Sequence, residues 1–127
     1  LWGVRKPVLI GARALGCHLP LTWRLTEDLD LAVAISIEEY PAGLETIPGW
    51  RQDPRAIQRW YTDEDVRLDI LPTGAEGCAR DFIDWPGEDR SMNAIGLRLA
   101  TDHAELAKLD DTLTVQVAPV SVLTVLK

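Results

Sequence analysis

Two segments of the chain alternate between apolar and polar residues with a period of two. In residues 28–35 the large aliphatic side chains fall on one face, while Asp28 and Asp30 fall on the other with two alanines. In residues 66–71 the aliphatic side chains again occupy every second position, and Asp69 lies on the opposite face. This period is typical of β-strands with one face against the core. We therefore expect two strands that carry aspartates opposite their core-facing side chains.

Shorter patterns complete the set of expected elements. Val8–Ile10 is an apolar run that predicts a buried strand, and residues 12–19 have the composition of a helix. Ser36 is a suitable N-cap for a short helix over 36–46. We also expect strands at 56–61, 95–99 and 113–117, a loop-like stretch at 75–93, and either strand or helix at 120–127. Strands interleaved with short helices predict an α+β fold, in which a mixed β-sheet is flanked by helices.

Length and composition narrow the class of protein. The 127 residues suit a single domain, and 46% apolar residues is ordinary for a globular chain. The net charge of −7 argues against a protein held on nucleic acid by overall charge. No apolar run is long enough to span a membrane and the first residues do not resemble a signal peptide, so we expect a cytoplasmic protein without membrane partners. The chain lacks a starting Met and ends inside an apolar segment, so we expect missing residues, especially at the C-terminus.

The aspartates are the strongest candidates for chemistry. On a strand, Asp28 and Asp30 would share a face about 6–7 Å apart, and Asp69 would join them if the two strands are neighbours. Adjacent carboxylates repel, and Asp is a poor strand former, so this arrangement lowers stability unless it serves a function. A hard divalent cation such as Mg²⁺ removes the repulsion and prefers oxygen ligands. The alternative is a solvated, purely structural acidic face.

A turn and several arginines suggest an anion site nearby. Gly11, Ala12 and Arg13 follow the first strand and open a helix, whose N–H groups could bind phosphate. Arg13 and Arg24 could hold phosphates with their planar guanidinium groups, or could pair with surface acids. The tryptophans at 50 and 60 bracket a run of arginines and could either stack nucleotides or cap the sheet. Cys17 and Cys78 form no metal-binding motif, and we expect reduced thiols.

Taken together, these motifs resemble the nucleotidyltransferase superfamily, whose fold is that of DNA polymerase β. The matching stretches are Ile10-Gly11-Ala12-Arg13-Ala14-Leu15, then Arg24-Leu25-Thr26-Glu27-Asp28-Leu29-Asp30-Leu31, and finally Arg67-Leu68-Asp69-Ile70-Leu71. Within the superfamily, these motifs are most similar to those of the AbiEii-type group of abortive-infection and toxin–antitoxin systems. The resemblance covers about residues 8–72 and extends more weakly to the end of the chain.

The resemblance implies a role for each matching residue. Asp28 and Asp30 would ligate nucleotide-bound Mg²⁺ (or Mn²⁺), and Asp69 would complete a second metal position and help deprotonate the acceptor hydroxyl. Gly11 would let the backbone approach the triphosphate. The flanking positions of the nucleotide site would be Ala12, Arg13, Arg24, Thr26 and Lys127. The last of these matches a lysine that the group carries on a helix, which favours helix at 120–127.

The implied activity is transfer of a nucleoside monophosphate from an NTP to an acceptor hydroxyl, with release of pyrophosphate. The acceptor could be RNA, a protein or a small molecule, and the AbiEii likeness favours a toxin that acts on tRNA or protein and has a cognate antitoxin. Two departures favour an alternative, a catalytically inactive domain that binds a nucleotide or a partner. Ala12 stands where the superfamily has Gly or Ser, and the chain stops before the place of the group's later acidic D-x-x-D motif.

Overall fold

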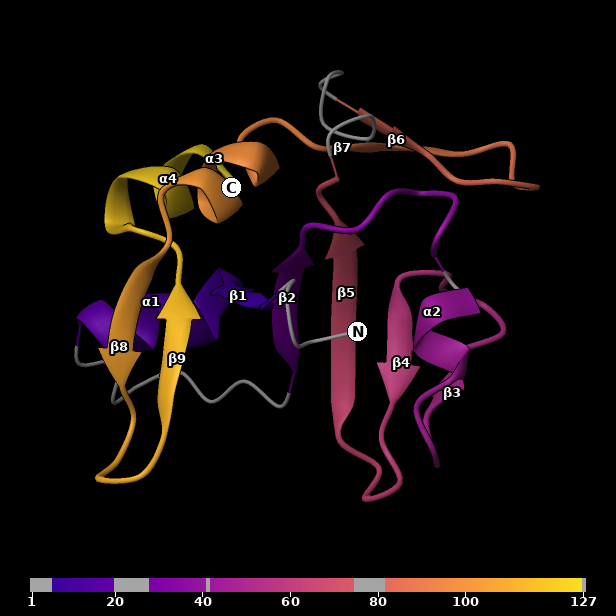
Figure 1. Ribbon diagram of the computed structural model, residues 1–127. Coiled ribbons are helices and arrows are strands. Elements are labelled where there is room, and N and C mark those ends of the chain that lie inside the picture. The colour runs from indigo at the N-terminus through magenta and orange to yellow at the C-terminus, as the bar shows by residue number, and fades with distance from the viewer. Residues whose placement is uncertain (1–5, 20–27, 41, 75–81, 127) are drawn as a thin grey trace.

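The computed structural model describes residues 6–19, 28–40, 42–74 and 82–126 as an α+β fold (Figure 1). A mixed seven-stranded sheet has the order β3-β4-β5-β2-β1-β9-β8, and a separate two-stranded sheet pairs β6 with β7. The strands are β1 (Val8–Ile10), β2 (Leu29–Val33), β3 (Arg51–Gln52), β4 (Arg59–Tyr61), β5 (Arg67–Pro72), β6 (Phe82–Asp84), β7 (Ser91–Asn93), β8 (Glu105–Lys108) and β9 (Thr114–Val117). The helices are α1 (Gly11–His18), α2 (Ala42–Glu45), α3 (Leu97–Asp102) and α4 (Val120–Val125). The expected mixed sheet with helices is confirmed.

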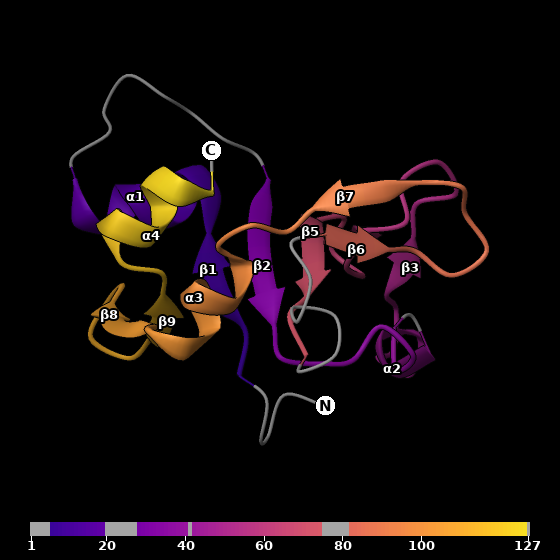
Figure 2. The same cartoon turned by 90° about the horizontal axis from the view of Figure 1, so that it is seen from above.

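The centre of the sheet consists of strands from distant parts of the chain. β2 runs antiparallel to β1 and parallel to β5, while β1 is also parallel to β9. The helices α1, α3 and α4 gather at the β1–β9–β8 end of the sheet, and α2 lies at the β3–β4 end (Figures 1 and 2). Within the described part of the chain, no helix is both long and apolar enough to cross a membrane.

An aromatic cluster fills the core beneath the β4–β5 end of the sheet. Trp60 of β4 is fully buried and meets Tyr40 edge-on, with ring centroids 6.2 Å apart. Tyr40 also packs against Trp85, at 5.2 Å. The polar atoms of this cluster are satisfied, because the indole N–H of Trp60 donates to the Tyr40 hydroxyl (2.7 Å), which donates in turn to the carbonyl of Ile57 (2.7 Å). Trp60 therefore caps the core and is not a stacking platform for nucleotides.

Several sequence predictions agree with these elements. The strands expected at 8–10, 28–35, 66–71 and 113–117 correspond to β1, β2, β5 and β9, and the helix expected at 12–19 corresponds to α1. The ambiguous segment after residue 119 is the helix α4. Of these segments, β2 and β5 are the two in which a period of two ran through the sequence.

The strand predicted at 95–99 is wrong, because this segment leads into helix α3. Gly96 has a φ of 85°, which a side chain would disfavour and which turns the chain away from an extended path. Leu97 and Ala100 are both buried and lie three residues apart, as expected for one face of a helix. The alternation of apolar residues at 95, 97 and 99 was therefore misleading.

Three further predictions need correction. The helix expected at 36–46 is reduced to a turn and the four-residue α2. Ser36 and Glu39 do make the reciprocal capping bonds (3.2 Å each), but proline, at position 41, has no N–H with which to continue a helix. The stretch expected to be loop-like contains the hairpin β6–β7, whose strands are too short to show a period. The strand expected at 56–61 begins only at Arg59, and β3 and β8 were not predicted.

Candidate functional site

Two of the three candidate aspartates face each other across neighbouring strands. Asp30 on β2 and Asp69 on β5 are direct partners in the parallel register. Neighbouring strands lie about 4.8 Å apart, and residues in register project from the same face of the sheet. Like charges placed directly opposite each other destabilise a sheet. The structure thus brings these two carboxylates together at a cost in stability, which is typical of a functional site.

Two arginines form ion pairs with Asp69 and with the neighbouring Asp28. Arg59 is the register partner of Asp69 across β4 and β5, and its Nε and Nη2 atoms donate to the two carboxylate oxygens at 2.9 and 3.0 Å. Arg67 makes an ion pair with Asp28, which lies just before β2. Two of the three candidate aspartates, Asp28 and Asp69, are therefore each paired with a positive charge.

Asp30 has a carboxyl group whose pKa is raised by its surroundings. Burial raises the pKa of its carboxyl group above 3.8, and the negative charges of Asp69 and Asp28 raise it further, while Arg59 acts in the opposite direction. The pKa of Arg59 is raised in turn, chiefly by its hydrogen bonds to Asp69. A nearby cation would favour the ionised form of Asp30, since it would offset both the repulsion and the lost hydration.

The turn into α1 lies directly against the carboxylate of Asp30. Gly11 has a φ of +67°, and a Cβ atom at this position would come within 2.2 Å of the Asp30 Oδ2 atom. Only glycine allows the backbone this conformation and this approach without strain. Ala12 and Arg13 follow in the first turn of α1. The residue before the helix, Ile10, has no side-chain acceptor with which to cap the first N–H groups.

The remaining predicted nucleotide-binding residues, Arg24, Thr26 and Lys127, lie outside the described residues, as does Cys78. Arg59 and Arg67 were not among the residues predicted for the candidate site. Their signal was available in part, because Arg67 shares a strand face with Asp69 by simple alternation. The partnership of Arg59 with Asp69 depends on strand order, which the sequence does not reveal.

The three aspartates have the chemistry to bind a hard cation, although their carboxylates do not converge on one point. Three carboxylates offer only oxygen ligands, as Mg²⁺ requires. Among the described residues, no three carboxylate, imidazole or thiol groups already form a ligand set. The side chains of Asp28 and Asp69 point to Arg67 and Arg59. The backbones of Asp30 and Asp69 are nevertheless direct neighbours across β2 and β5. Because Gly11 has no Cβ, the Asp30 carboxylate can lie directly against its backbone. Side chains would have to rotate for the three carboxylates to meet at one cation.

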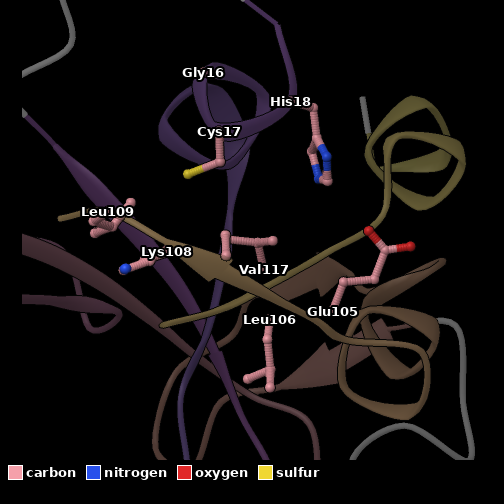
Figure 3. A pocket seen from close by; sticks show the side chains of 9 residues that line it. Gly16, Cys17, His18, Glu105, Leu106, Lys108, Leu109 and Val117 are labelled. Atoms are coloured by element: carbon pink, nitrogen blue, oxygen red, sulfur yellow. The ribbon is translucent and has the colours of Figure 1, made fainter. Parts of the chain in front are cut away.

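A separate hollow of about 460 Å³ lies between the last turn of α1 and strands β8 and β9. In Figure 3, Cys17 and His18 descend from α1, Glu105 extends toward His18, and Leu106 points away from the helix. The His18 Nε2 atom lies 2.8 Å from the carbonyl oxygen of Ala118, which ties α1 to the chain before α4. His18 thus has a structural role, and the aspartates do not line this hollow.

Comparison with protein-family models gave no match, and comparison with curated proteins gave none either. The functional argument therefore depends on the geometry of the residues themselves.

Proposed function

We propose that this protein is a metal-dependent nucleotidyltransferase with a polymerase-β-like fold. One observation carries the proposal, which is the in-register pairing of Asp30 with Asp69 beside the Gly11 turn. Two in-register carboxylates of like charge, next to a backbone without a side chain, form a place where a cation and an anion can be held together. The motif resemblance at the same residues gives this arrangement its chemistry.

Each residue then has a defined task. Asp28, Asp30 and Asp69 would hold Mg²⁺ or Mn²⁺, which would neutralise the charge that develops on the phosphates during an in-line displacement. Gly11 and the first turn of α1 would lie against the triphosphate. The acceptor oxygen forms a bond to the α-phosphorus, the bond from that phosphorus to the bridging oxygen breaks, and pyrophosphate leaves with the electron pair. The carboxylate of Asp69 takes the proton of the acceptor hydroxyl.

The AbiEii likeness favours a tRNA or protein hydroxyl as acceptor, and a cognate antitoxin as partner. The test is pyrophosphate release with each NTP, with Mg²⁺ or Mn²⁺, in the presence of total tRNA or of the protein alone. Asp28→Ala should reduce the rate roughly 100-fold or more, as removal of a charge-stabilising group does in other enzymes. The control is Asp102→Ala, which removes a carboxylate from an exposed ion pair on α3. Equal rates in both variants would exclude a role for Asp28.

A second candidate is a nucleotide-binding or partner-binding domain without catalysis. The observation in its favour is that arginines already neutralise Asp28 and Asp69. Metal-dependent binding of an NTP, without any pyrophosphate release, would identify this alternative.

A further inference from the structure

Two arginines cover two of the expected metal ligands, and they do so in different ways. Arg59 engages both oxygens of Asp69 at once, at 2.9 and 3.0 Å. The two side chains are only 27% and 17% exposed, so the pair is better shielded from water than an ordinary surface ion pair. Arg67 holds Asp28 from the strand next to it. A cation that approaches Asp69 must share the carboxylate oxygens with Arg59 or displace it from them.

Another arginine on the same sheet face provides a contrast. Arg51 is the register partner of Tyr61 and lies over its ring, 4.6 Å from the centroid. Its ion pair is made with the exposed Asp65, which is not a candidate metal ligand. Arg51 therefore offers a matched position, with the same charge and sheet face but without the proposed role.

We propose that Arg59 and Arg67 are exchange residues: in the free protein they neutralise Asp69 and Asp28, and on loading they move to the phosphates while the carboxylates turn to the cation. This inference rests on the proposed function. The backbones stay in register, so that only side-chain rotations are needed. Arginine suits both states, because its planar group binds carboxylate and phosphate alike with two parallel hydrogen bonds.

The exchange makes binding of cation and phosphate cooperative. A cation alone must leave the two guanidinium groups unpaired beside it, and a phosphate alone must leave the carboxylates unpaired and mutually repelling. Binding both ligands satisfies all partners at once, and linkage requires each ligand to raise the affinity for the other by the same factor. The protein would thereby discriminate against free Mg²⁺ and favour the metal-bound polyphosphate.

Arginine side-chain NMR observes the exchange directly. In the free protein the Nε–H protons of Arg59 and Arg67 should exchange slowly with water because they are hydrogen-bonded. Mg²⁺ alone at saturating concentration should speed their exchange and shift the carboxyl carbons of the three aspartates. Magnesium pyrophosphate should shift the same carbons and restore slow exchange. Arg98, whose partner on α3 is Asp102, is the internal control and should not respond.

Variants separate the exchange from a simple effect of charge. Arg59→Lys keeps the charge but cannot grip both oxygens of Asp69, so it should bind Mn²⁺ about three- to tenfold tighter than the wild type, because the competing conformation is less populated. Arg59→Gln should bind Mn²⁺ tighter but magnesium pyrophosphate more weakly. Arg51→Gln should bind both ligands as the wild type does, within about twofold.

The outcomes distinguish failure of this inference from failure of the proposed function. If Mg²⁺ shifts the aspartate carbons while Arg59 remains protected, the metal site is real and the exchange is wrong. If Arg59→Lys binds Mn²⁺ no more tightly than the wild type, charge alone accounts for the effect of Arg59 and the exchange is again wrong. If no aspartate carbon responds to Mg²⁺, with or without pyrophosphate, the metal site itself fails and the exchange fails with it.

Discussion

Gly11→Ala tests the close approach on which the site depends. Two costs add at this position. A residue with a Cβ loses about 1–2 kcal/mol in the left-handed backbone region, and the φ here is +67°. The new Cβ would also meet the Asp30 side chain, at 2.2 Å from Oδ2, 3.0 Å from Cγ and 3.2 Å from Cβ. Overpacking of this kind costs typically about 1–3 kcal/mol. We expect a total loss of roughly 2–5 kcal/mol.

A matched glycine separates the two costs. Gly87 has a φ of +77°, and a Cβ there would meet nothing within 4 Å. Gly87→Ala should therefore show the backbone cost alone, about 1–2 kcal/mol. In an Asp30→Ala background the two closest atoms disappear and only the contact with the Asp30 Cβ remains. The cost of Gly11→Ala should then fall by roughly 1–3 kcal/mol, which is the coupling energy of the double-mutant cycle.

The assay is urea unfolding of the four proteins of the cycle and of Gly87→Ala, followed by circular dichroism. Stabilities of small domains are about 5–15 kcal/mol, so each variant should retain a measurable folded baseline. If Gly11→Ala costs no more than Gly87→Ala, or if removal of the Asp30 carboxylate leaves its cost unchanged, the turn does not lie against that carboxylate. The reasoning that places phosphate and metal side by side would then be refuted.

Three further substitutions test other parts of the account. Asp30→Asn should stabilise the protein at neutral pH by about 0.2–1 kcal/mol, because it removes a like-charge pair. Since the pKa of Asp30 is raised in the folded state, the stability of the wild type should fall as the pH rises above 3.8. Urea unfolding of the Asp30→Asn variant at several pH values should lack this fall in stability. Tyr40→Phe should cost about 1–3 kcal/mol in urea unfolding, since the buried indole N–H of Trp60 loses its acceptor, and a cost near zero would show that the bond is not formed. Gly16→Ala should raise the stability by about 0.5–1 kcal/mol, because position 16 is helical and a Cβ there meets nothing within 4 Å. A lower melting temperature in the variant would contradict the placement of α1 beside the open hollow.

Elements with one uninterrupted period were predictable from the sequence. β2 and β5 alternate cleanly, and the buried residues of β5 are those that the alternation predicts. The segment before α3 shows the limit, because residues 95–99 alternate as a strand would, whereas the left-handed Gly96 and the pair Leu97 and Ala100 decide for a helix. Three-residue strands such as those of the β6–β7 hairpin depend on their partner for stability, and no local pattern announces them.

The three aspartates of the candidate site were predictable as residues, but their geometry and their arginine partners were not. The shared face of Asp28 and Asp30 follows from alternation, whereas the register of Asp30 against Asp69 depends on a parallel pairing between strands separated by other elements. The ion pairs of Arg59 and Arg67 depend on the same register. Long-range pairings of this kind are set by the packing of the entire sheet, and local sequence does not encode them.

Manganese binding, followed by electron paramagnetic resonance, tests the central claim most directly. The wild type and the double variant Asp30→Asn/Asp69→Asn would be titrated with Mn²⁺, with Asp102→Asn as the control for loss of an exposed carboxylate. The account predicts saturable binding to the wild type and to the control, and at least a roughly tenfold loss of affinity in the double variant, because two oxygen ligands are replaced by neutral amides. Equal binding by the double variant and the wild type would show that the paired aspartates do not hold a metal, and the proposed function would fall with them.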